Sequence, residues 1–283
     1  MPNDYKIIYS TENTYDNWVN NAYWQFLIIP MENNTQHHID VEFSNSLFAV
    51  NEFSTNGYGF RTIRVHPKKK FKKIIFEARF SLVKDTVDPF NFPLDLNDSL
   101  AYKEINELNF KINFESFLRS TLLTKLPDNL KSKFQFNLSN TIFENLQALN
   151  KWTFNNLQFK TGVTQVDSKL LDILVAKQGV CQDFTHLFCA MARQNGIPTR
   201  YVSGYLNQEH GLLGDSQMHA WAEAYIPFVG WKGFDPTNNI LANTNHIKVC
   251  HGKDYNDCSP LRGVIYSNGQ NVTSHTVLVQ SQQ

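Results

Sequence analysis

Cys181, His219 and Asp235 are the residues whose types and order along the chain suit nucleophilic chemistry. A cysteine thiolate attacks carbonyl carbon, whereas a neutral thiol is a weak nucleophile and needs a base that takes its proton. A histidine can be that base, and a carboxylate bound to its other ring nitrogen fixes the tautomer and orientation of the imidazole. The surrounding sequence must therefore activate the cysteine and bring the other two residues to it.

Cys181 is predicted to lie in the first turn of a helix, shortly after the helix-breaking Gly179. Unpaired N–H groups and the positive end of the helix dipole stabilise a thiolate over a thiol at that position. Gly196 and Pro198 are predicted to end the helix. Its buried face is indicated by apolar residues at positions i, i+3, i+4 and i+7, namely Phe184, Leu187, Phe188 and Met191.

The other cysteines are predicted to be structural, because a lone cysteine is usually a small buried residue. Cys189 lies in the middle of the same helix with no glycine before it. Cys250 and Cys258 are expected to be free thiols, although they could pair in an oxidising compartment. A zinc site of Cys181, His186 and Cys189 is not expected, because their spacing is not that of a structural site. We expect no metal and no cofactor.

His219 and Asp235 are predicted to lie on the two strands of one hairpin. The segment His219–Ile226 alternates alanine or isoleucine with polar and aromatic residues, which indicates a strand. The segment Gly230–Asp235 is predicted to be the returning strand, and Pro236 favours extended geometry at the aspartate before it.

The register of this hairpin decides whether the two residues can meet. If Ile226 paired with Trp231, Asp235 would point away from His219, so the connection needs an odd number of residues or a bulge. We predict the register that places Trp221 opposite Asp235. His219 is then one diagonal step away, at roughly 7 to 8 Å between backbones, which two side chains can bridge.

Less specific interpretations compete for these residues. A strand histidine is more often a partly exposed surface group, and an aspartate before proline more often begins a turn. Composition alone does not show which histidine is the base. The other candidates are His186, His210, His246, His251 and His275. Asp183 is interpreted as a cap of the helix, and Trp221, Trp231 and Tyr225 as walls or core of a cleft.

The first part of the chain is predicted to be an antiparallel β-sandwich that carries no chemistry. Up to about residue 85, short runs rich in Val, Ile, Phe and Tyr alternate with Asn, Thr and Gly clusters. The basic run 68–73 is interpreted as the solvated tip of a β-hairpin. A linker is placed at 86–98, which contains two prolines and several turn-forming residues. Buried positions on one strand are expected at Phe76, Ala78, Phe80 and Leu82.

Helices and then strands are predicted after the linker, which indicates an α+β domain with an antiparallel sheet. Helical spacing joins Ile142, Phe143, Leu146 and Leu149, and a second helix is expected after a capping Asp167 or Ser168. The apolar positions of that second helix are Leu170, Leu171, Leu174 and Val175. Strands are expected at 200–206, 219–226, 230–235 and 273–279. The expected domains are a sandwich at 1–90 and a second domain at 91–283.

The bulk composition excludes several classes of protein. Of 283 residues, 42% are hydrophobic and 18% charged, as in a folded protein, and the length suggests two domains. Lys plus Arg equals Asp plus Glu at 26 each, so no net field attracts nucleic acid. No apolar run approaches the roughly 18 residues of a membrane span. The opening MPNDYKIIYS lacks the pattern of a signal peptide, so we expect a cytoplasmic location.

Three successive blocks resemble those of bacterial transglutaminase-like proteins, members of the superfamily of transglutaminases and papain-like cysteine proteases. The blocks are GVCQDFTHLFCAMARQNGIPTRYVSGYL, HAWAEAYIPFVGWKGFDPTN and HIKVCHGKDYNDCSPLRGV. The resemblance covers about residues 100 to 283, and the segments DYKIIYSTENTY and LIIP more loosely resemble the β-domain that precedes the core in these proteins. Thr185 and Ser120 depart from the family pattern, where alanine and proline are common, but neither is a catalytic position.

The resemblance implies an α+β fold, with an N-terminal antiparallel β-sandwich followed by a papain-like/transglutaminase-like core of helices packed on an antiparallel sheet. It also implies that Cys181 is the nucleophile, His219 the base and Asp235 the residue that orients this base. The Cys181 N–H is expected to bind the oxyanion. Trp152 is a candidate second donor, because an upstream tryptophan has this role in animal transglutaminases, although a core role is commoner.

The activity implied by the resemblance is cysteine-dependent acyl transfer on peptide or glutamine carboxamide bonds through a thioester. Hydrolysis, as in a cysteine protease or amidase, is the first expectation, and the expected partner is a peptide or protein substrate. Transfer to an amine, as in a crosslinking transglutaminase, and a non-catalytic peptide-binding module remain the alternatives.

Overall fold

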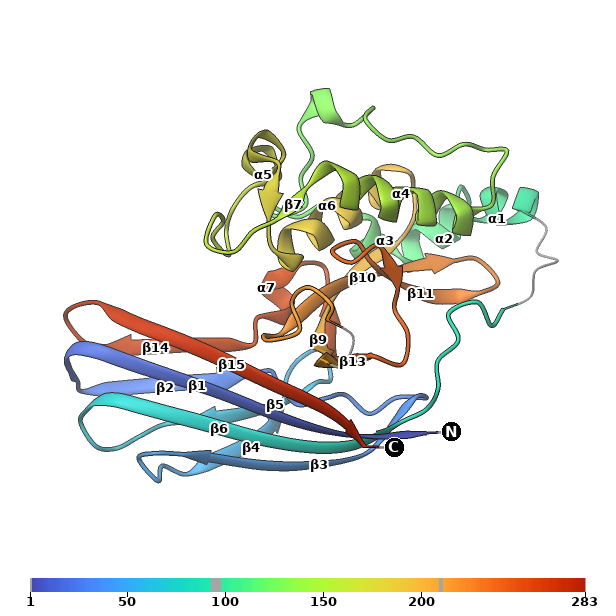
Figure 1. Cartoon of the computed structure of the whole chain (residues 1–283). Coiled ribbons are helices and arrows are strands. Elements are labelled where there is room, and N and C mark those ends of the chain that lie inside the picture. Colours follow the sequence, from blue (N-terminus) through green and yellow to red (C-terminus); the bar gives the residue numbers. More distant parts are fainter. Residues whose placement is uncertain (1, 93–97, 209–210, 283) are drawn as a thin grey trace.

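A computed structural model describes residues 2–92, 98–208 and 211–282 of the chain. A β-sandwich forms one half of the molecule, and helices packed on an antiparallel sheet form the other (Figure 1). The predicted α+β fold with an N-terminal β-sandwich is therefore confirmed. None of the helices in the described ranges has both the length and the apolar character of a membrane span.

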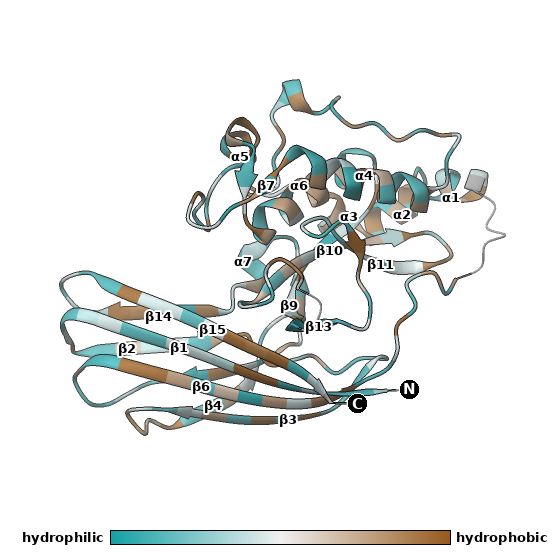
Figure 2. Cartoon of the chain, in the orientation of Figure 1, coloured by the Kyte–Doolittle hydropathy of each residue, from teal (hydrophilic) through white to brown (hydrophobic). Residues whose placement is uncertain are grey.

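The sandwich consists of two four-stranded antiparallel sheets, with strand orders β15-β1-β6-β3 and β14-β2-β5-β4. Apolar and polar residues alternate along these strands (Figure 2), so each sheet has one face in the core. The strands are β1 (Asn3–Val19), β2 (Asn21–Phe26), β3 (Gln36–Asn45), β4 (Asn51–Thr55), β5 (Arg61–Val65), β6 (Phe71–Lys84), β14 (Leu261–Tyr266) and β15 (Asn271–Gln282).

The last two strands of the chain complete the N-terminal sandwich, which differs from the expected division into 1–90 and 91–283. Strand β15 pairs with β1, where Val279 lies opposite Ile7, and β14 pairs with β2, where Leu261 lies opposite Phe26. The two ends of the chain therefore lie side by side (Figure 1). Alternation in the sequence predicts a strand at 273–279 but does not indicate which sheet it joins.

The predicted alternation on β6 is present, and it extends one residue pair further. Phe76, Ala78, Phe80 and Leu82 are buried, as expected from the pattern. Lys84 occupies the next buried position and is only 4% exposed. A lysine thus stands where the strand pattern calls for an apolar side chain, which is unusual for a residue that is almost never buried without a partner.

The basic run 68–73 does not form the tip of a hairpin. Strands β5 and β6, which flank it, lie in different sheets, so the run joins the two layers of the sandwich. Lys68, Lys69 and Lys70 are exposed there, as expected of a solvated segment. Lys73 continues into β6 and forms an ion pair with Glu12 at 2.8 Å.

The second half of the molecule is a five-stranded antiparallel sheet of order β12-β11-β10-β9-β13, with helices on one side (Figure 1). Its strands are β9 (Thr199–Leu206), β10 (His219–Ile226), β11 (Gly230–Asp235), β12 (Ile240–Leu241) and β13 (His246–Gly252). The helices are α1 (Asp98–Glu104), α2 (Leu108–Asn113), α3 (Glu115–Leu118), the 3-10 helix η1 (Asp128–Leu130), α4 (Ile142–Asn156), α5 (Leu170–Ala176), α6 (Cys181–Gln194) and α7 (Tyr255–Cys258). Two short strands, β7 (Gln158–Phe159) and β8 (Gln178–Gly179), pair in parallel beside them.

Helices α4 and α5 begin differently from each other. At α4, Thr141 and Glu144 form a reciprocal capping box, which satisfies two N–H groups of the first turn. At α5, the residue before the helix is Lys169, and no side chain caps the helix. The prediction that Asp167 or Ser168 caps it is therefore wrong. Leu170 and Ile173 are the buried residues of α5, whereas Leu171 and Val175 are exposed, because this short helix packs along one narrow stripe.

The sheet contacts the sandwich through buried hydrogen bonds as well as apolar packing. Tyr205 of β9 donates its hydroxyl proton to the Ile28 carbonyl at 2.7 Å. Gln36 of β3 donates to the Lys248 carbonyl at 2.9 Å and accepts from the Lys248 N–H at 2.7 Å. Strands β9 and β13 are therefore fixed to the sandwich by specific pairings.

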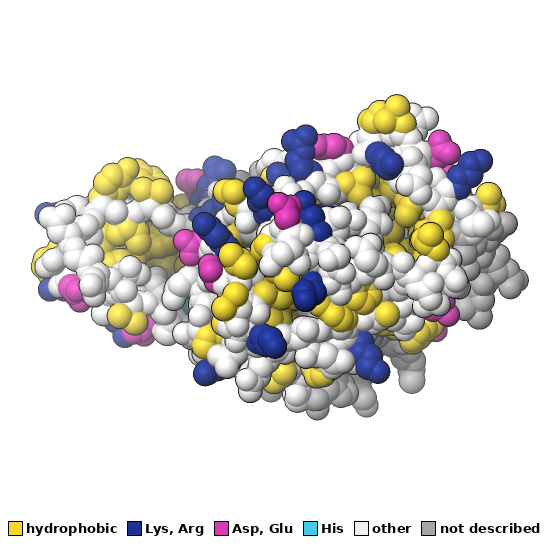
Figure 3. Space-filling model, turned by 90° about the horizontal axis from the view of Figure 1, so that it is seen from above, with side chains coloured by type: hydrophobic (Ala, Val, Ile, Leu, Met, Phe, Trp, Pro, Cys, Tyr) yellow, Lys and Arg dark blue, Asp and Glu magenta, His cyan; other side chains and the backbone are white. Residues whose placement is uncertain are grey.

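On the face seen in Figure 3, basic side chains are scattered with acidic ones among them.

Replacement of Val279 by alanine tests the attachment of the C-terminal strand to the sandwich. Val279 is 1% exposed and faces the core, so we expect Val279→Ala to lower the free energy of unfolding by roughly 2 to 3 kcal/mol. Val272 lies on the same strand and is 72% exposed, so Val272→Ala should change the free energy of unfolding by less than about 0.5 kcal/mol. Urea denaturation measures both variants, and equal effects would contradict the assignment of β15 to the sandwich core.

Candidate active site

Cys181 is the first residue of α6, as the sequence predicts. The N–H groups of a first helical turn lack intrahelical acceptors, and the helix dipole places partial positive charge there. The side chain is partly exposed, in contrast to Cys189, Cys250 and Cys258, which are buried. Residues 182–193 of α6 are all buried, so the helix is a central core element that is accessible only at its two ends, Cys181 and Gln194.

Asp183 closes the first turn of α6, in agreement with its interpretation as a cap. Its Oδ2 accepts hydrogen bonds from the Val180 N–H at 2.8 Å and from the Thr164 hydroxyl at 2.7 Å. Burial raises the pKa of this carboxyl group, against the effect of these two donors. A Cβ at position 179 would lie 2.6 Å from the same oxygen, so only glycine allows the carboxylate to approach the backbone here.

The hairpin β10–β11 has the register that brings His219 towards Asp235. Its pairs run from Ala222 with Phe234 to Ile226 with Gly230, and residues 227–229 connect the strands. The connection therefore has an odd number of residues, as the parity argument requires. In this register Trp221 lies opposite Asp235, which is the predicted arrangement.

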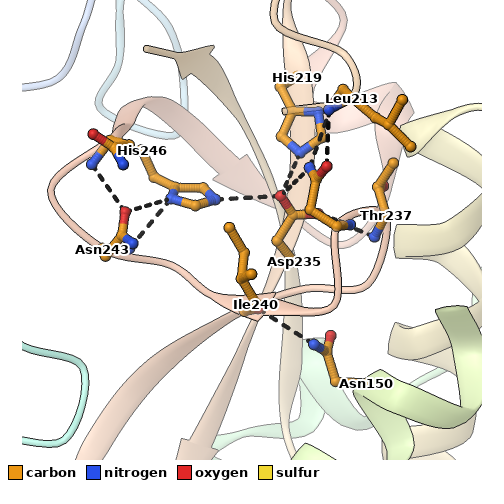
Figure 4. Close-up of polar contacts among 10 residues, drawn as sticks. Asn150, Leu213, His219, Asp235, Thr237, Ile240, Asn243 and His246 are labelled. Carbon is orange, nitrogen blue, oxygen red and sulfur yellow. Dashed lines mark hydrogen bonds and ion pairs between the residues drawn. The ribbon is translucent and has the colours of Figure 1, made fainter. Parts of the chain in front are cut away.

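The structure brings His219 and Asp235 into direct contact (Figure 4). His219 Nε2 lies 2.9 Å from Asp235 Oδ2, and both side chains are fully buried. On β10, Ala222, Ala224 and Ile226 pack in the core around α6, so the alternation of the strand places His219 on the opposite face.

Asp235 accepts five hydrogen bonds, which compensate for the burial of its charge. Its Oδ1 accepts from the N–H groups of Thr237 and Asn238, and its Oδ2 accepts from the Asn238 amide, His219 and His246. Burial alone would raise the pKa of Asp235, but the two histidines hold it well below its usual range. The aspartate is therefore ionised at neutral pH.

His219 is protonated at neutral pH because of this aspartate. Burial lowers the pKa of the imidazole, but the charge and hydrogen bond of Asp235 raise it, and the Cys181 side chain adds to the rise. The net pKa is about 10. Nε2 binds Asp235, so Nδ1 is the ring nitrogen that can interact with Cys181. Among the described residues Nδ1 forms no hydrogen bond.

The backbone at Gly214 encloses the Nδ1 side of the His219 ring. A Cβ at position 214 would lie 2.6 Å from Nδ1, and the φ of Gly214 is +88°, a left-handed conformation that favours glycine. The loop that contains Gly214 can therefore pass close to the imidazole without covering it with a side chain.

His246 is a member of this cluster that the sequence could not single out from the other histidines. Its Nε2 lies 3.3 Å from Asp235 Oδ2, and its Nδ1 accepts the Asn243 N–H at 3.2 Å, which leaves the proton on Nε2 (Figure 4). Burial lowers the pKa of His246 more than Asp235 raises it, so this ring is neutral. Strands β11 and β13 are not neighbours in the sheet, so no local pattern signals the contact.

The remaining candidate histidines have other partners. His186 accepts the Tyr255 N–H at 3.1 Å inside the core, His251 contacts Arg200 at 3.2 Å, and His275 contacts the Tyr9 hydroxyl at 3.3 Å. His210 lies outside the described residues. Within the described ranges, no three His, Cys, Asp or Glu side chains are grouped in a way that could hold a metal ion.

Of the candidate aromatic residues, Trp221 packs against the cluster, whereas Trp231 and Trp152 pack elsewhere. Trp221 is buried, and its ring lies 6.3 Å from that of His219 and 5.2 Å from that of His246. Trp231 packs edge-on against Tyr225 at 5.5 Å. Trp152 packs against Phe134 at 5.8 Å within the helical core, which is the commoner of its two expected roles.

The segment that contains the site is similar to a known superfamily. Residues 129–236 match the model of the transglutaminase-like superfamily, and these residues include all three predicted site positions. Across its whole length the chain is similar in fold to a solved structure from Cytophaga hutchinsonii described as a putative cysteine protease, with a TM-score of 0.77 at 20% identity. The match covers 100% of this chain and 92% of the other.

Relatives in other bacteria share part of the chain. An uncharacterised protein of Mycobacterium leprae is 41% identical over 137 residues, which are 47% of this chain and 48% of the relative. One from Mycobacterium tuberculosis is 37% identical over 139 residues, 46% of this chain and 44% of the relative. The match thus spans under half the length of these relatives. A Pseudomonas aeruginosa protein-glutamine gamma-glutamyltransferase is 33% identical over 86 residues, 28% of this chain and 12% of that protein.

The protonation state of His219 can be measured directly. We expect its ring to keep both N–H protons through neutral pH and to lose one near pH 10, because of the Asp235 carboxylate. In Asp235→Asn only the effect of burial and a weaker effect of Cys181 remain, so the pKa should fall towards or below the ordinary value of about 6.5. Histidine side-chain nitrogen NMR over this pH range distinguishes the two results.

His186 is the internal control for this titration, because burial lowers its pKa to about 3 and its ring should stay neutral throughout. A wild-type His219 that titrates near 6.5 would contradict the proposed ion pair. The unfolded chain releases the same proton near 6.5, so the pair stabilises the fold fully below that pH. This stabilisation is lost as the pH rises towards 10.

Proposed function

We propose that this chain, in which residues 129–236 are a transglutaminase-like domain, is a cysteine-dependent acyl-transfer enzyme that hydrolyses peptide or glutamine carboxamide bonds. The observation that carries the proposal is the buried contact of His219 Nε2 with Asp235, which leaves Nδ1 free for Cys181, the side chain that also raises the pKa of His219. This is the arrangement that a thiolate nucleophile needs, with a base whose orientation is fixed by a third group.

Acylation is the first half of the proposed reaction. The Cys181 sulfur attacks the carbonyl carbon of the substrate, and the carbonyl oxygen becomes an oxyanion that the Cys181 N–H at the start of α6 stabilises. When the tetrahedral intermediate collapses, the bond from carbon to nitrogen breaks and His219 gives its Nδ1 proton to the departing amine or ammonia. A thioester on Cys181 and a neutral His219 remain.

Deacylation returns the site to its starting state. Neutral His219 takes a proton from water, the resulting hydroxide attacks the thioester carbon, and the thiolate leaves as the carboxylic acid product forms. His219 is then protonated again beside the thiolate. Throughout the cycle Asp235 stays ionised, and its bonds from Asn238 and His246 keep the carboxylate in place behind the imidazole.

Transfer to an amine is the second candidate function. The same thioester can react with a lysine side chain instead of water, and the three residues have identical roles in both reactions. The similarity to a protein named protein-glutamine gamma-glutamyltransferase supports this alternative, although it extends over 28% of this chain. The acceptor is determined by access to the thioester and not by the chemistry of the nucleophile.

Alkylation rates test whether Cys181 is a reactive thiolate. We expect iodoacetamide at neutral pH to modify Cys181 far faster than the other cysteines, by roughly 10²-fold or more. Burial raises the pKa of Cys189 to about 11, and all three of the other cysteines are inaccessible in the folded chain. Peptide mass spectrometry after timed quenching gives the rate at each site.

Asp235→Asn is the matched variant for this alkylation experiment, because it removes the charge that keeps His219 protonated while Cys181 stays in place. The rate at Cys181 should fall in the variant. Rates at Cys181 and Cys189 that are equally slow in the wild type would favour a non-catalytic peptide-binding module over an enzyme.

Product analysis separates hydrolysis from transfer. A library of glutamine-containing peptides is incubated with and without a labelled primary amine, and ammonia, cleaved peptide and incorporated label are measured. We expect ammonia or cleaved peptide to form in equal amounts with and without the amine. Cys181→Ala should abolish all products, and Asp235→Asn should lower kcat/KM by roughly 10²- to 10⁴-fold because the imidazole loses its fixed tautomer.

Asp128→Asn is the control for the loss of a carboxylate, because Asp128 is an exposed residue of η1 that forms an ion pair with Lys131. Its activity should equal that of the wild type. Activity of Cys181→Ala at the wild-type level would overturn the proposed chemistry. If the labelled amine, and not water, is the main acceptor, the result favours the crosslinking alternative.

A further inference from the structure

A second polar site lies between the sheet and the sandwich, and one side of it is open to solvent. It is a cavity of about 430 Å³, bounded by β9, β10, β11 and β13 on one side and by the end of β6 and the start of β3 on the other. Trp221 and His246, which pack around the His219 and Asp235 pair, also line this cavity. It is of the size of small-molecule sites in proteins.

The charges around the cavity do not balance. Among the described residues, four basic side chains line it against two acidic ones, which leaves a surplus of two positive charges because the histidines are neutral. Buried charges are normally paired, because an unpaired one loses its hydration without compensation. The charged residues in the lining are Lys84, Arg200, Lys232, Lys248, Asp88 and Glu223.

Glu223 already neutralises as much as one carboxylate can. It accepts from Lys248 Nζ at 2.6 Å and from Arg200 Nε at 2.5 Å through the same oxygen. Burial alone would raise the pKa of Glu223, but these two cations lower it to about 2. One negative charge is thus shared by two buried positive charges.

Lys84 carries the surplus charge that is most deeply buried. It stands at the position of β6 where an apolar residue is expected. Among the described residues its ammonium group makes hydrogen-bonding contacts only with neutral oxygens, and these contacts are long. These are Gln36 Oε1 at 3.3 Å and Thr35 Oγ1 at 3.4 Å. Burial lowers the pKa of Lys84 to about 8, so the group is still charged at neutral pH.

Acidic residues near the cavity have other partners. Asp85, next to Lys84 in the chain, is paired with His37 at 3.0 Å on the outer side of the strand. Asp235 lies beyond His246 and already accepts five hydrogen bonds. Neither carboxylate makes a hydrogen bond or ion pair with Lys84 in the described residues.

The walls of the cavity suit a ligand with a carbon skeleton. Trp221 and Trp231 provide flat apolar surface, and the Arg200 guanidinium stacks over the Trp231 ring at 4.1 Å, which fixes its orientation. We propose that this cavity binds a small dicarboxylate, with Lys84 bound to one carboxylate and the Arg200 and Lys248 pair close to the other. The two negative charges of such a ligand equal the surplus of the lining, and its carbon chain packs on the tryptophans.

Calorimetric titration of the full chain with succinate tests the proposal. We expect succinate to bind and its neutral diamide, succinamide, not to bind, because the diamide has the same skeleton without the charge. Acetate and inorganic phosphate should bind at least about tenfold more weakly, since each lacks either the second carboxylate or the carbon chain. Absence of succinate binding, or equal binding of succinamide, overturns the site, and equal binding of phosphate overturns its assignment to dicarboxylates.

Lys84→Met is the diagnostic variant, because methionine fills the buried space without the charge. It should weaken succinate binding by about tenfold or more. Lys70→Met removes a lysine on the exposed segment before β6 and should leave binding unchanged. Arg200→Gln is the second variant, since Arg200 belongs to the pair that the proposal places close to the other carboxylate, and it should also weaken succinate binding by about tenfold. Wild-type affinity in either Lys84→Met or Arg200→Gln would overturn the proposal.

Discussion

The buried contact between His219 and Asp235 is the interaction on which the proposed chemistry depends. Two charges without access to water are costly, and their attraction compensates for this cost only if the remaining hydrogen-bonding capacity is used. Here the turn after β11 supplies the Thr237 and Asn238 donors, and His246 supplies a further one. The carboxylate is thus held ionised and in place, and it keeps the imidazole protonated and oriented towards the side of Cys181.

The sheet keeps its two faces chemically distinct. On one face, β10 packs against α6 through alanine and isoleucine side chains, so the helix that begins at Cys181 lies close to the strand that carries His219. The other face holds the polar residues, from His219 to Glu223, and it is covered by the sandwich. Some buried polar groups lie where these two layers meet, and hydrogen bonds across the junction, such as those between Gln36 and Lys248, satisfy them.

The sandwich is built from both ends of the chain, which ties its stability to that of the residues between them. Strands β14 and β15 return after the last strand of the sheet and complete one edge of each sandwich layer. Residues 27–260 are therefore enclosed between the paired strands β2 and β14. The junction with the sheet, through Tyr205, Gln36 and Lys248, then positions β9 and β13 relative to the sandwich.

The sequence by itself determined the local elements of the site. Gly179 and the apolar spacing after it indicate a helix that begins at Cys181, and the alternation and parity of β10 and β11 indicate the register that joins His219 to Asp235. Only the tertiary structure decided that β15 belongs to the sandwich, that His246 binds Asp235, and that Lys84 is buried beside Gln36. Periodicity and turn length act between neighbours in the chain, whereas the partner of a strand and the neutralisation of a buried charge depend on residues far apart in it.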